Sequence, residues 1–120
     1  MSLRVGPFTR DPVTGKMQFI KVDPGKDLAG FEVYRHEFWG TTIMQELGLK
    51  LLPTLGDGIW LVIENEELDS LEEEALIILR NAALIAQKAA PDQTHVEFYA
   101  NNILNAIRIA REVNGGVQIS

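Results

Sequence analysis

Apolar and polar positions alternate near the start of the chain, a pattern that predicts strands. The alternation covers residues 3–9 and, less regularly, residues 16–22. Between them, an Asp-Pro-Val-Thr-Gly run at residues 11–15 favours a tight turn, because proline presets φ and glycine accepts a positive φ. We therefore expect a β-hairpin, with further short strands at residues 31–34 and 117–119.

The middle of the chain predicts one short helix and one strand. Trp39, Ile43 and Leu47 recur at fourfold spacing, which indicates a helix over residues 37–47. Five consecutive large apolar residues at 59–63 predict a strand that is buried on both faces. Its tryptophan, Trp60, is interpreted as a core residue, and the alternative is a platform for a ligand.

Two long helices are predicted next, over residues 70–90 and 94–114. Each begins with the spacing of a capping box, Ser70 with Glu73 and Thr94 with Glu97. The connection between the two helices is short, and their lengths are equal. We therefore expect an antiparallel helical hairpin.

The first long helix is apolar around most of its surface. Its polar residues recur every seven positions and form one narrow stripe. One partner helix cannot cover such a surface, so we expect the sheet on one side and the second helix, or another copy of the protein, on the other. The predicted fold class is α+β: an antiparallel sheet of four to five strands with one short helix and a long antiparallel helical hairpin packed on one face. Residues 1–120 form a single domain, and a homodimer through the helical hairpin is expected.

Composition and charge narrow the function classes. The chain is 46% hydrophobic and 23% charged, which is typical of a globular domain. Its net charge of −6 argues against binding to nucleic acid or anionic lipid, because both need a surplus of Lys and Arg. The sequence has neither an apolar run of membrane-spanning length nor the apolar stretch of a signal peptide, so we expect a cytoplasmic protein.

Residues that carry catalysis or bind metals are scarce. The chain has no cysteine, and its two histidines, His36 and His95, lack the spacing of metal ligands. The three serines lie at the two ends and at a predicted helix cap, which excludes a serine triad. We expect no metal and no cofactor. An enzymatic role is disfavoured but left open.

The segment from residue 64 to residue 74 is strongly acidic. It holds seven carboxylates and no basic residue, so its charge of −7 exceeds that of the whole chain. Negative charge at a helix N-terminus explains one or two of these groups, and the rest are either simply solvated or attract a basic protein. The predicted partner-binding residues are Glu64, Glu66, Glu67, Asp69, Glu72 and Glu73.

A second candidate site lies where a predicted strand meets the short helix. Tyr34, Arg35, His36 and Trp39 bring a cation, a titratable imidazole and aromatic rings into one short segment. This composition suits a pocket for a small ligand or an enzymatic site. In the alternative interpretation the aromatic rings belong to the core, and Arg35 and His36 face water.

Three functional hypotheses follow. The first is a non-enzymatic protein that docks a basic partner through the acidic segment. Its predicted order of elements is similar in outline to that of some toxin-neutralising immunity proteins, although no motif accompanies the likeness. The second is a small-ligand-binding or enzymatic domain with its pocket near residues 34–39. The third is a self-associating structural protein.

Overall fold

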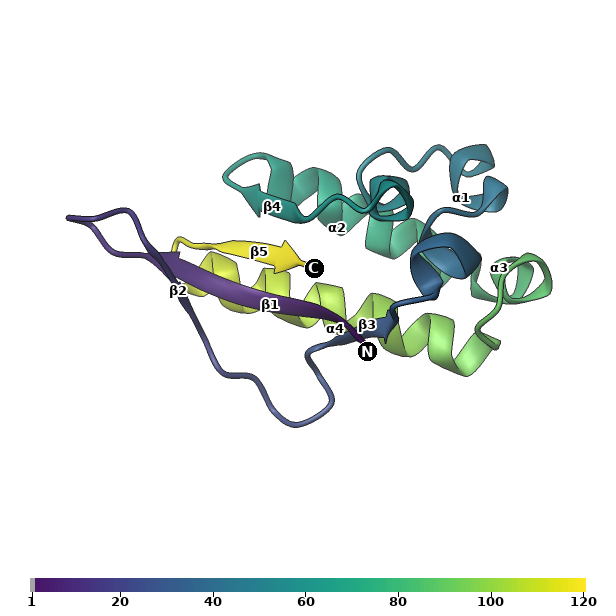
Figure 1. Cartoon of the computed structure of the whole chain (residues 1–120), viewed down its shortest axis with the longest axis horizontal. Helices are drawn as coiled ribbons and strands as arrows, with labels where there is room; N and C mark the ends of the chain where they lie inside the picture. The colour runs from purple at the N-terminus through teal and green to yellow at the C-terminus, as the bar shows by residue number, and fades with distance from the viewer. Residues whose placement is uncertain (1) are drawn as a thin grey trace.

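The computed structural model describes residues 2–120 and confirms the predicted α+β class (Figure 1). The sheet is antiparallel throughout, in the order β2-β1-β5-β4, and β3 also pairs with β1. The five strands are β1 (Ser2–Arg10), β2 (Met17–Phe19), β3 (Leu28–Phe31), β4 (Leu61–Glu64) and β5 (Gly116–Ile119).

The helices lie mainly between β3 and β5 in the sequence. They are the π-helix η1 (Arg35–Trp39), α1 (Thr42–Glu46), the 3₁₀-helix η2 (Leu52–Asp57), α2 (Glu67–Arg80), α3 (Ala82–Lys88) and α4 (Gln93–Glu112). The chain then turns at two glycines and returns as β5, the central strand between β1 and β4.

Helix α4 joins the two layers of the molecule. It packs against β1, β3 and β5 on one side and against α2 and α3 on the other, and α2 also packs against β4. The buried sheet side chains that face these helices are Leu3, Val5, Leu61, Ile63, Val117 and Ile119. Within residues 2–120, no helix covers the opposite face of the sheet (Figure 1).

The predicted hairpin is confirmed, with a shorter second strand. The Asp11 carboxylate accepts hydrogen bonds from the backbone N–H groups of Val13 and Thr14, both at 2.8 Å, and Gly15 has a φ of +74°. The strand predicted at residues 31–34 instead ends at Phe31. A buried amide from α4 holds this region: Asn102 Nδ2 donates to the backbone oxygen of Leu28 at 2.8 Å.

The predicted helix at residues 37–47 is divided into η1 and α1. The division lies at Gly40, where η1 crosses η2 at backbone contact. A Cβ atom on Gly40 would lie 2.6 Å from the Arg35 carbonyl oxygen and 3.0 Å from Cα of Gly56. Only glycine permits this crossing, and the periodicity of apolar residues does not reveal it.

The helical hairpin is confirmed, but its helix ends differ from the prediction. The first helix begins at Glu67, so Ser70 lies inside it and forms no cap. Asn81 interrupts this helix, since its side chain donates to the Ile77 carbonyl oxygen at 2.8 Å and its backbone leaves helical geometry. The cap of α4 is Asp92, which accepts the His95 N–H at 2.9 Å, so the predicted cap at Thr94 is also wrong.

The prediction of a doubly buried strand at residues 59–63 is wrong. Strand β4 is the outermost strand of the sheet, and only Leu61 and Ile63 of this run are buried. Trp60 is 66% exposed and Val62 is 39% exposed, so Trp60 is not a core residue. The physical reason is that helices cover only one face of the sheet.

Glu74, a member of the acidic segment, is buried rather than exposed. Its carboxylate accepts hydrogen bonds at 2.9–3.2 Å from the backbone N–H groups of Lys50, Leu51 and Leu52. These groups lie at the start of η2, where helical N–H groups have no partner within the helix. Glu74 therefore joins α2 to the segment that leads into β4.

Replacing Glu74 with glutamine tests this role. A Glu74→Gln side chain keeps one acceptor oxygen and turns an NH₂ group toward backbone donors. We expect the free energy of unfolding to fall by about 1–3 kcal/mol, measured by urea denaturation. The matched control is Glu73→Gln, which removes only an exposed ion pair with Arg80 and should cost less than about 1 kcal/mol. Equal losses in the two variants would contradict the role.

Candidate functional site

Three of the seven carboxylates in the acidic segment are paired with arginines that are distant in sequence. Arg10, on β1, makes two hydrogen bonds to Glu64, at 2.9 and 2.8 Å. Arg111, near the end of α4, reaches Asp69 at 2.6 Å and Glu72 at 2.7 Å. These arginines hold β4 to β1 and α2 to α4, so part of the acidic segment stabilises the fold.

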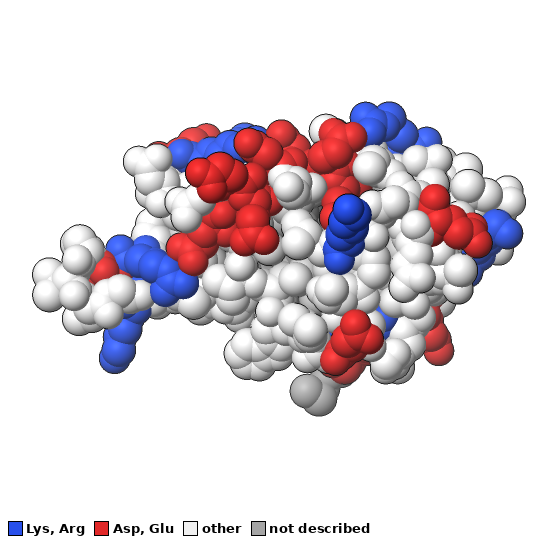
Figure 2. Space-filling model, turned by 90° about the horizontal axis from the view of Figure 1, so that it is seen from above, with Lys and Arg blue, Asp and Glu red and all other residues white. Residues whose placement is uncertain are grey.

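Glu66 and Glu67 differ from their neighbours. Both are exposed at the turn from β4 into α2, and neither forms an ion pair within residues 2–120. Three guanidinium groups, from Arg10, Arg80 and Arg111, pair with four of the six predicted partner-binding carboxylates. The six negative and three positive charges leave a local net charge of −3. Figure 2 views the molecule from the side of β4 and α2 and shows red side chains gathered there, with blue ones beside them.

The pair between Arg10 and Glu64 crosses strand β5 and joins β1 to β4. Strand β5 lies between the two residues. Its Gly116 pairs with Phe8 on β1 and with Glu64 on β4, so the side chains of Arg10 and Glu64 meet above Gly116. A Cβ on Gly116 would lie 2.6 Å from the Phe8 ring and 2.7 Å from Cγ of Glu64. Hydrogen bonds from Arg10 lower the pKa of Glu64, and the same pair raises the pKa of Arg10.

The uncovered face of the sheet carries several apolar side chains. Phe8 is fully buried there, under Phe19 and beside the guanidinium of Arg10, which lies 5.5 Å from its ring centroid. Phe19 itself is 59% exposed. At the other edge, Trp60 and Val62 are exposed on this face, because alternate residues of a strand point to the same side.

A groove of about 570 Å³ lies on the same face, between β1 and the loop after β2. Half of its lining residues are apolar or glycine and half are polar or charged; they include Gly6, Phe19, Ile20, Val22, Lys21 and Asp27. Arg4 in this lining is already paired with Asp27, at 2.6 Å. The groove therefore presents apolar surface and no set of convergent catalytic groups.

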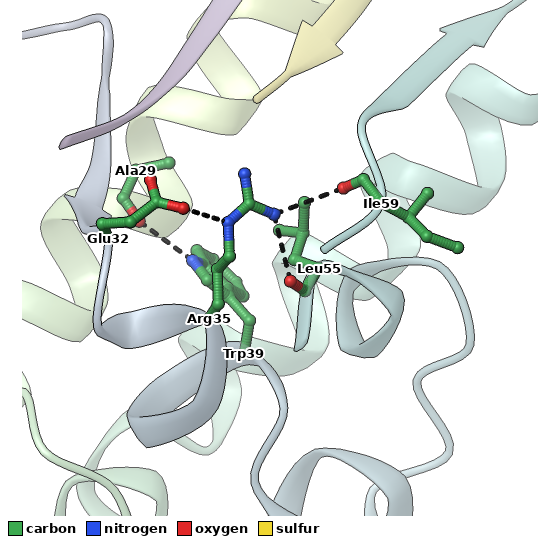
Figure 3. A network of polar contacts seen from close by, with 6 residues as sticks. All are labelled: Ala29, Glu32, Arg35, Trp39, Leu55 and Ile59. Atoms are coloured by element: carbon green, nitrogen blue, oxygen red, sulfur yellow. Dashed lines mark hydrogen bonds and ion pairs between the residues drawn. The ribbon is translucent and has the colours of Figure 1, made fainter. Parts of the chain in front are cut away.

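The predicted pocket at residues 34–39 does not form one cavity. Figure 3 shows the Arg35 guanidinium between the Glu32 carboxylate and the carbonyl oxygens of Leu55 and Ile59, at 3.1 and 3.4 Å. Arg35 is therefore buried as a link from η1 to η2 and the start of β4. This burial favours the alternative interpretation of residues 34–39, in which the segment belongs to the folded core and forms no ligand pocket. One part of that interpretation is wrong, because Arg35 is buried and does not face water.

The other three residues of the predicted pocket point to different places. Trp39 is fully buried, and its indole N–H donates to the Ala29 carbonyl oxygen at 2.9 Å (Figure 3). Tyr34 is half-buried among aromatic rings, with its ring centroid 6.1 Å from that of Tyr99. His36 is exposed and borders two shallow polar depressions.

Features expected of other protein classes are not found in residues 2–120. No three His, Cys, Asp or Glu side chains are arranged to hold a metal ion in this part of the chain. None of its helices is both long and apolar enough to cross a membrane. Comparison of the chain with known protein families, with curated proteins and with solved structures found no match.

The best-defined candidate site is the surface where β4 meets α2. We name it the β4–α2 surface and define it by Trp60, Val62, Glu64, Glu66 and Glu67. It combines exposed apolar side chains with carboxylates, two of which have no basic partner within residues 2–120. Sequence reasoning identified its acidic half but assigned its apolar half to the core.

Fluorescence quenching tests the exposure of Trp60. Trp39 is enclosed and Trp60 is open, so acrylamide should quench mainly the emission of Trp60. In a Trp60→Phe variant the remaining emission should lie at shorter wavelength and resist quenching. Caesium should quench the wild-type protein more than iodide does, because carboxylates attract the cation to this surface. Strong quenching of the Trp60→Phe variant would contradict the assignment.

The ion pair of Glu64 gives a pH prediction. Because its pKa is lowered in the folded protein, the pair stabilises the fold above the ordinary glutamate pKa of about 4.3 and loses this effect as the pH falls through the folded value. A carboxyl titration followed by NMR should show Glu64 titrating below about 4.3 in the wild type. In an Arg10→Gln variant its pKa should rise toward the ordinary value, and an unchanged pKa would exclude the pair.

Proposed function

We propose that the protein is a non-enzymatic binding module that captures a basic protein through the β4–α2 surface. The observation that carries this proposal is that Trp60 and Val62, on and just before β4, are exposed and apolar, and that Glu66 and Glu67, at the turn directly after β4, have no ion pair within residues 2–120. Protein interfaces commonly combine an apolar centre, often with tryptophan, and a polar rim.

The remaining carboxylates support the same surface from its border. Asp69, Glu72 and Glu73 keep much of their side chains in water, although Arg111 and Arg80 offset part of their charge. Charges at such a border mainly raise the association rate of an oppositely charged partner, and salt screens them. Binding should therefore be fast at low ionic strength and weaken as salt is added.

The structure gives less support to the other two hypotheses. A ligand pocket near residues 34–39 would need Arg35 and Trp39 to be available, and both are used in internal hydrogen bonds. A homodimer through the helical hairpin stays a prediction. Leu84 on α3 is exposed, but such single apolar side chains are common on protein surfaces.

Selection from a displayed library of random peptides tests the proposal without a known partner. Peptides that bind the wild-type protein should be rich in Lys or Arg together with apolar residues. A Glu66→Lys/Glu67→Lys variant should lose at least about tenfold in affinity for the selected peptides, measured by isothermal titration calorimetry.

A charge-matched control separates local recognition from net charge. Glu37 and Glu46 are exposed, have no ion pair within residues 2–120 and lie far from β4 in sequence. The Glu37→Lys/Glu46→Lys variant has the same net charge as the test variant and should bind the peptides like the wild type. The proposal fails if the two variants behave alike, or if the selected peptides carry no basic residues.

A further inference from the structure

We propose that the free edge of β4 is a site of strand addition, at which an extended basic segment of the partner joins the sheet. This inference rests on the proposed function and specifies its binding mode. It starts from the hydrogen-bonding pattern of the sheet and does not depend on the identity of the partner.

The hydrogen-bonding pattern of the sheet determines which backbone N–H and C=O groups of β4 point toward β5 and which point away from the sheet. Arg4 and Ser120 exchange both backbone hydrogen bonds, at 2.7 and 2.9 Å. In an antiparallel pair of strands, residues that exchange two backbone hydrogen bonds with their partner alternate with residues that exchange none. Gln118 lies two positions before Ser120 on β5, so its N–H and C=O groups also point toward β1. Its neighbours on β5 therefore bond to Leu61 and Ile63 of β4. Val62, between them, directs both backbone groups away from the sheet.

The edge of β4 is open. No hydrogen bond from another part of residues 2–120 reaches the backbone of Val62, and no strand lies beyond β4. Of the usual protections of such edges, β4 lacks proline, lysine and a bulge, but it is short, 4 residues, and ends at a charged residue, Glu64. At the other side of the sheet, β1 is covered by β2, β3 and the loop between them, and the outer strand β2 is flanked by Lys16 and Lys21, which disfavour a basic segment there.

Carboxylates lie at the end of this edge, on β4 and on the first residues of α2. Glu64 is on the uncovered face of the sheet with Phe8 and Arg10. Glu67 is seven residues before Glu74 on α2 and shares its helical face, which is directed toward the segment leading into β4. A strand added to β4 would therefore meet Trp60 and Val62 on the uncovered face, where Glu64 is already paired with Arg10, and the exposed carboxylates of Glu66 and Glu67 at the end of β4.

This charge distribution favours a basic segment over the same strand of a second copy. Residues 51–79 contain no Lys or Arg, so β4 of another copy would bring no positive charge to Glu64 or Glu67. A strand with alternating apolar and basic side chains satisfies the backbone groups, the apolar surface and the carboxylates together. Strand addition supplies affinity through the main chain and specificity through alternate side chains.

A matched pair of variants at Val62 tests this binding mode. The Val62→Pro change removes the free N–H and should leave the fold intact, because proline is tolerated at a strand edge where its nitrogen faces solvent. The Val62→Thr change keeps the N–H and the branched side chain. The probe is a short peptide of alternating Val and Lys, with an alternating Val and Glu peptide as its control, and circular dichroism checks the fold of both variants.

We expect the basic peptide to bind wild type and Val62→Thr with similar affinity, and to bind Val62→Pro about tenfold more weakly, since a backbone hydrogen bond is lost. In wild type, peptide binding should slow hydrogen exchange of the Val62 amide, a readout that does not depend on the proline variant. Equal binding to Val62→Thr and Val62→Pro, with no protection of this amide, would overturn strand addition.

The arms of the experiment also separate the two proposals. If binding depends on Glu66 and Glu67 but not on Val62, the proposed function stands and the strand mode is wrong. If the basic peptide binds no better than the acidic one, both are wrong. If the wild type forms a dimer that the Val62→Pro change dissociates and that the peptide does not displace, the edge of β4 is occupied by a second copy. This result would overturn the basic segment as its occupant.

Discussion

One helix, α4, supports strands β1, β3 and β5, while α2 supports β4, and this constraint determines which surfaces of the protein are closed. The apolar side chains of α4 fill the space between the sheet and helices α2 and α3, so the main core lies on one side of the strands, and Phe8 is buried separately on the other side. No second layer covers the other side within residues 2–120. The exposed apolar residues at β2 and β4 follow from this arrangement, because a strand in a two-layer fold buries only alternate side chains.

The carboxylates of residues 64–74 serve the fold in two different ways. Glu74 is buried and organises the chain ahead of η2, whereas Glu64, Asp69 and Glu72 hold arginines from β1 and α4. These contacts account for much of the charge that makes the segment conspicuous. The exposed carboxylates of the segment without an ion pair within residues 2–120 are Glu66 and Glu67, which lie at the turn between β4 and α2. They are fewer than the seven carboxylates of the segment in the sequence.

The fold class and most strands could be predicted from sequence because they depend on local patterns. The hairpin is an example, since its turn chemistry is complete within five residues. Two of the errors involve contacts between distant segments, and a third involves a local hydrogen bond from a side chain to the backbone of its own helix. The buried Asn102 fixes the position of β3, the crossing of Gly40 with Gly56 divides a helix, and Asn81 interrupts another. Composition located the acidic half of the site, but five apolar residues in a row cannot show which face of a strand a helix will cover.

An open edge strand normally risks pairing with any exposed strand, including that of another copy. In this protein the carboxylates around β4 limit that risk, because they repel acidic segments and add no attraction for neutral ones. The same charges lower the energy of a basic strand at this position. Under the proposed binding mode, protection against self-association and selection of a partner are one electrostatic property of the edge, since discrimination by repulsion is as much a part of specificity as attraction is. A neutral edge of the same shape would lack both.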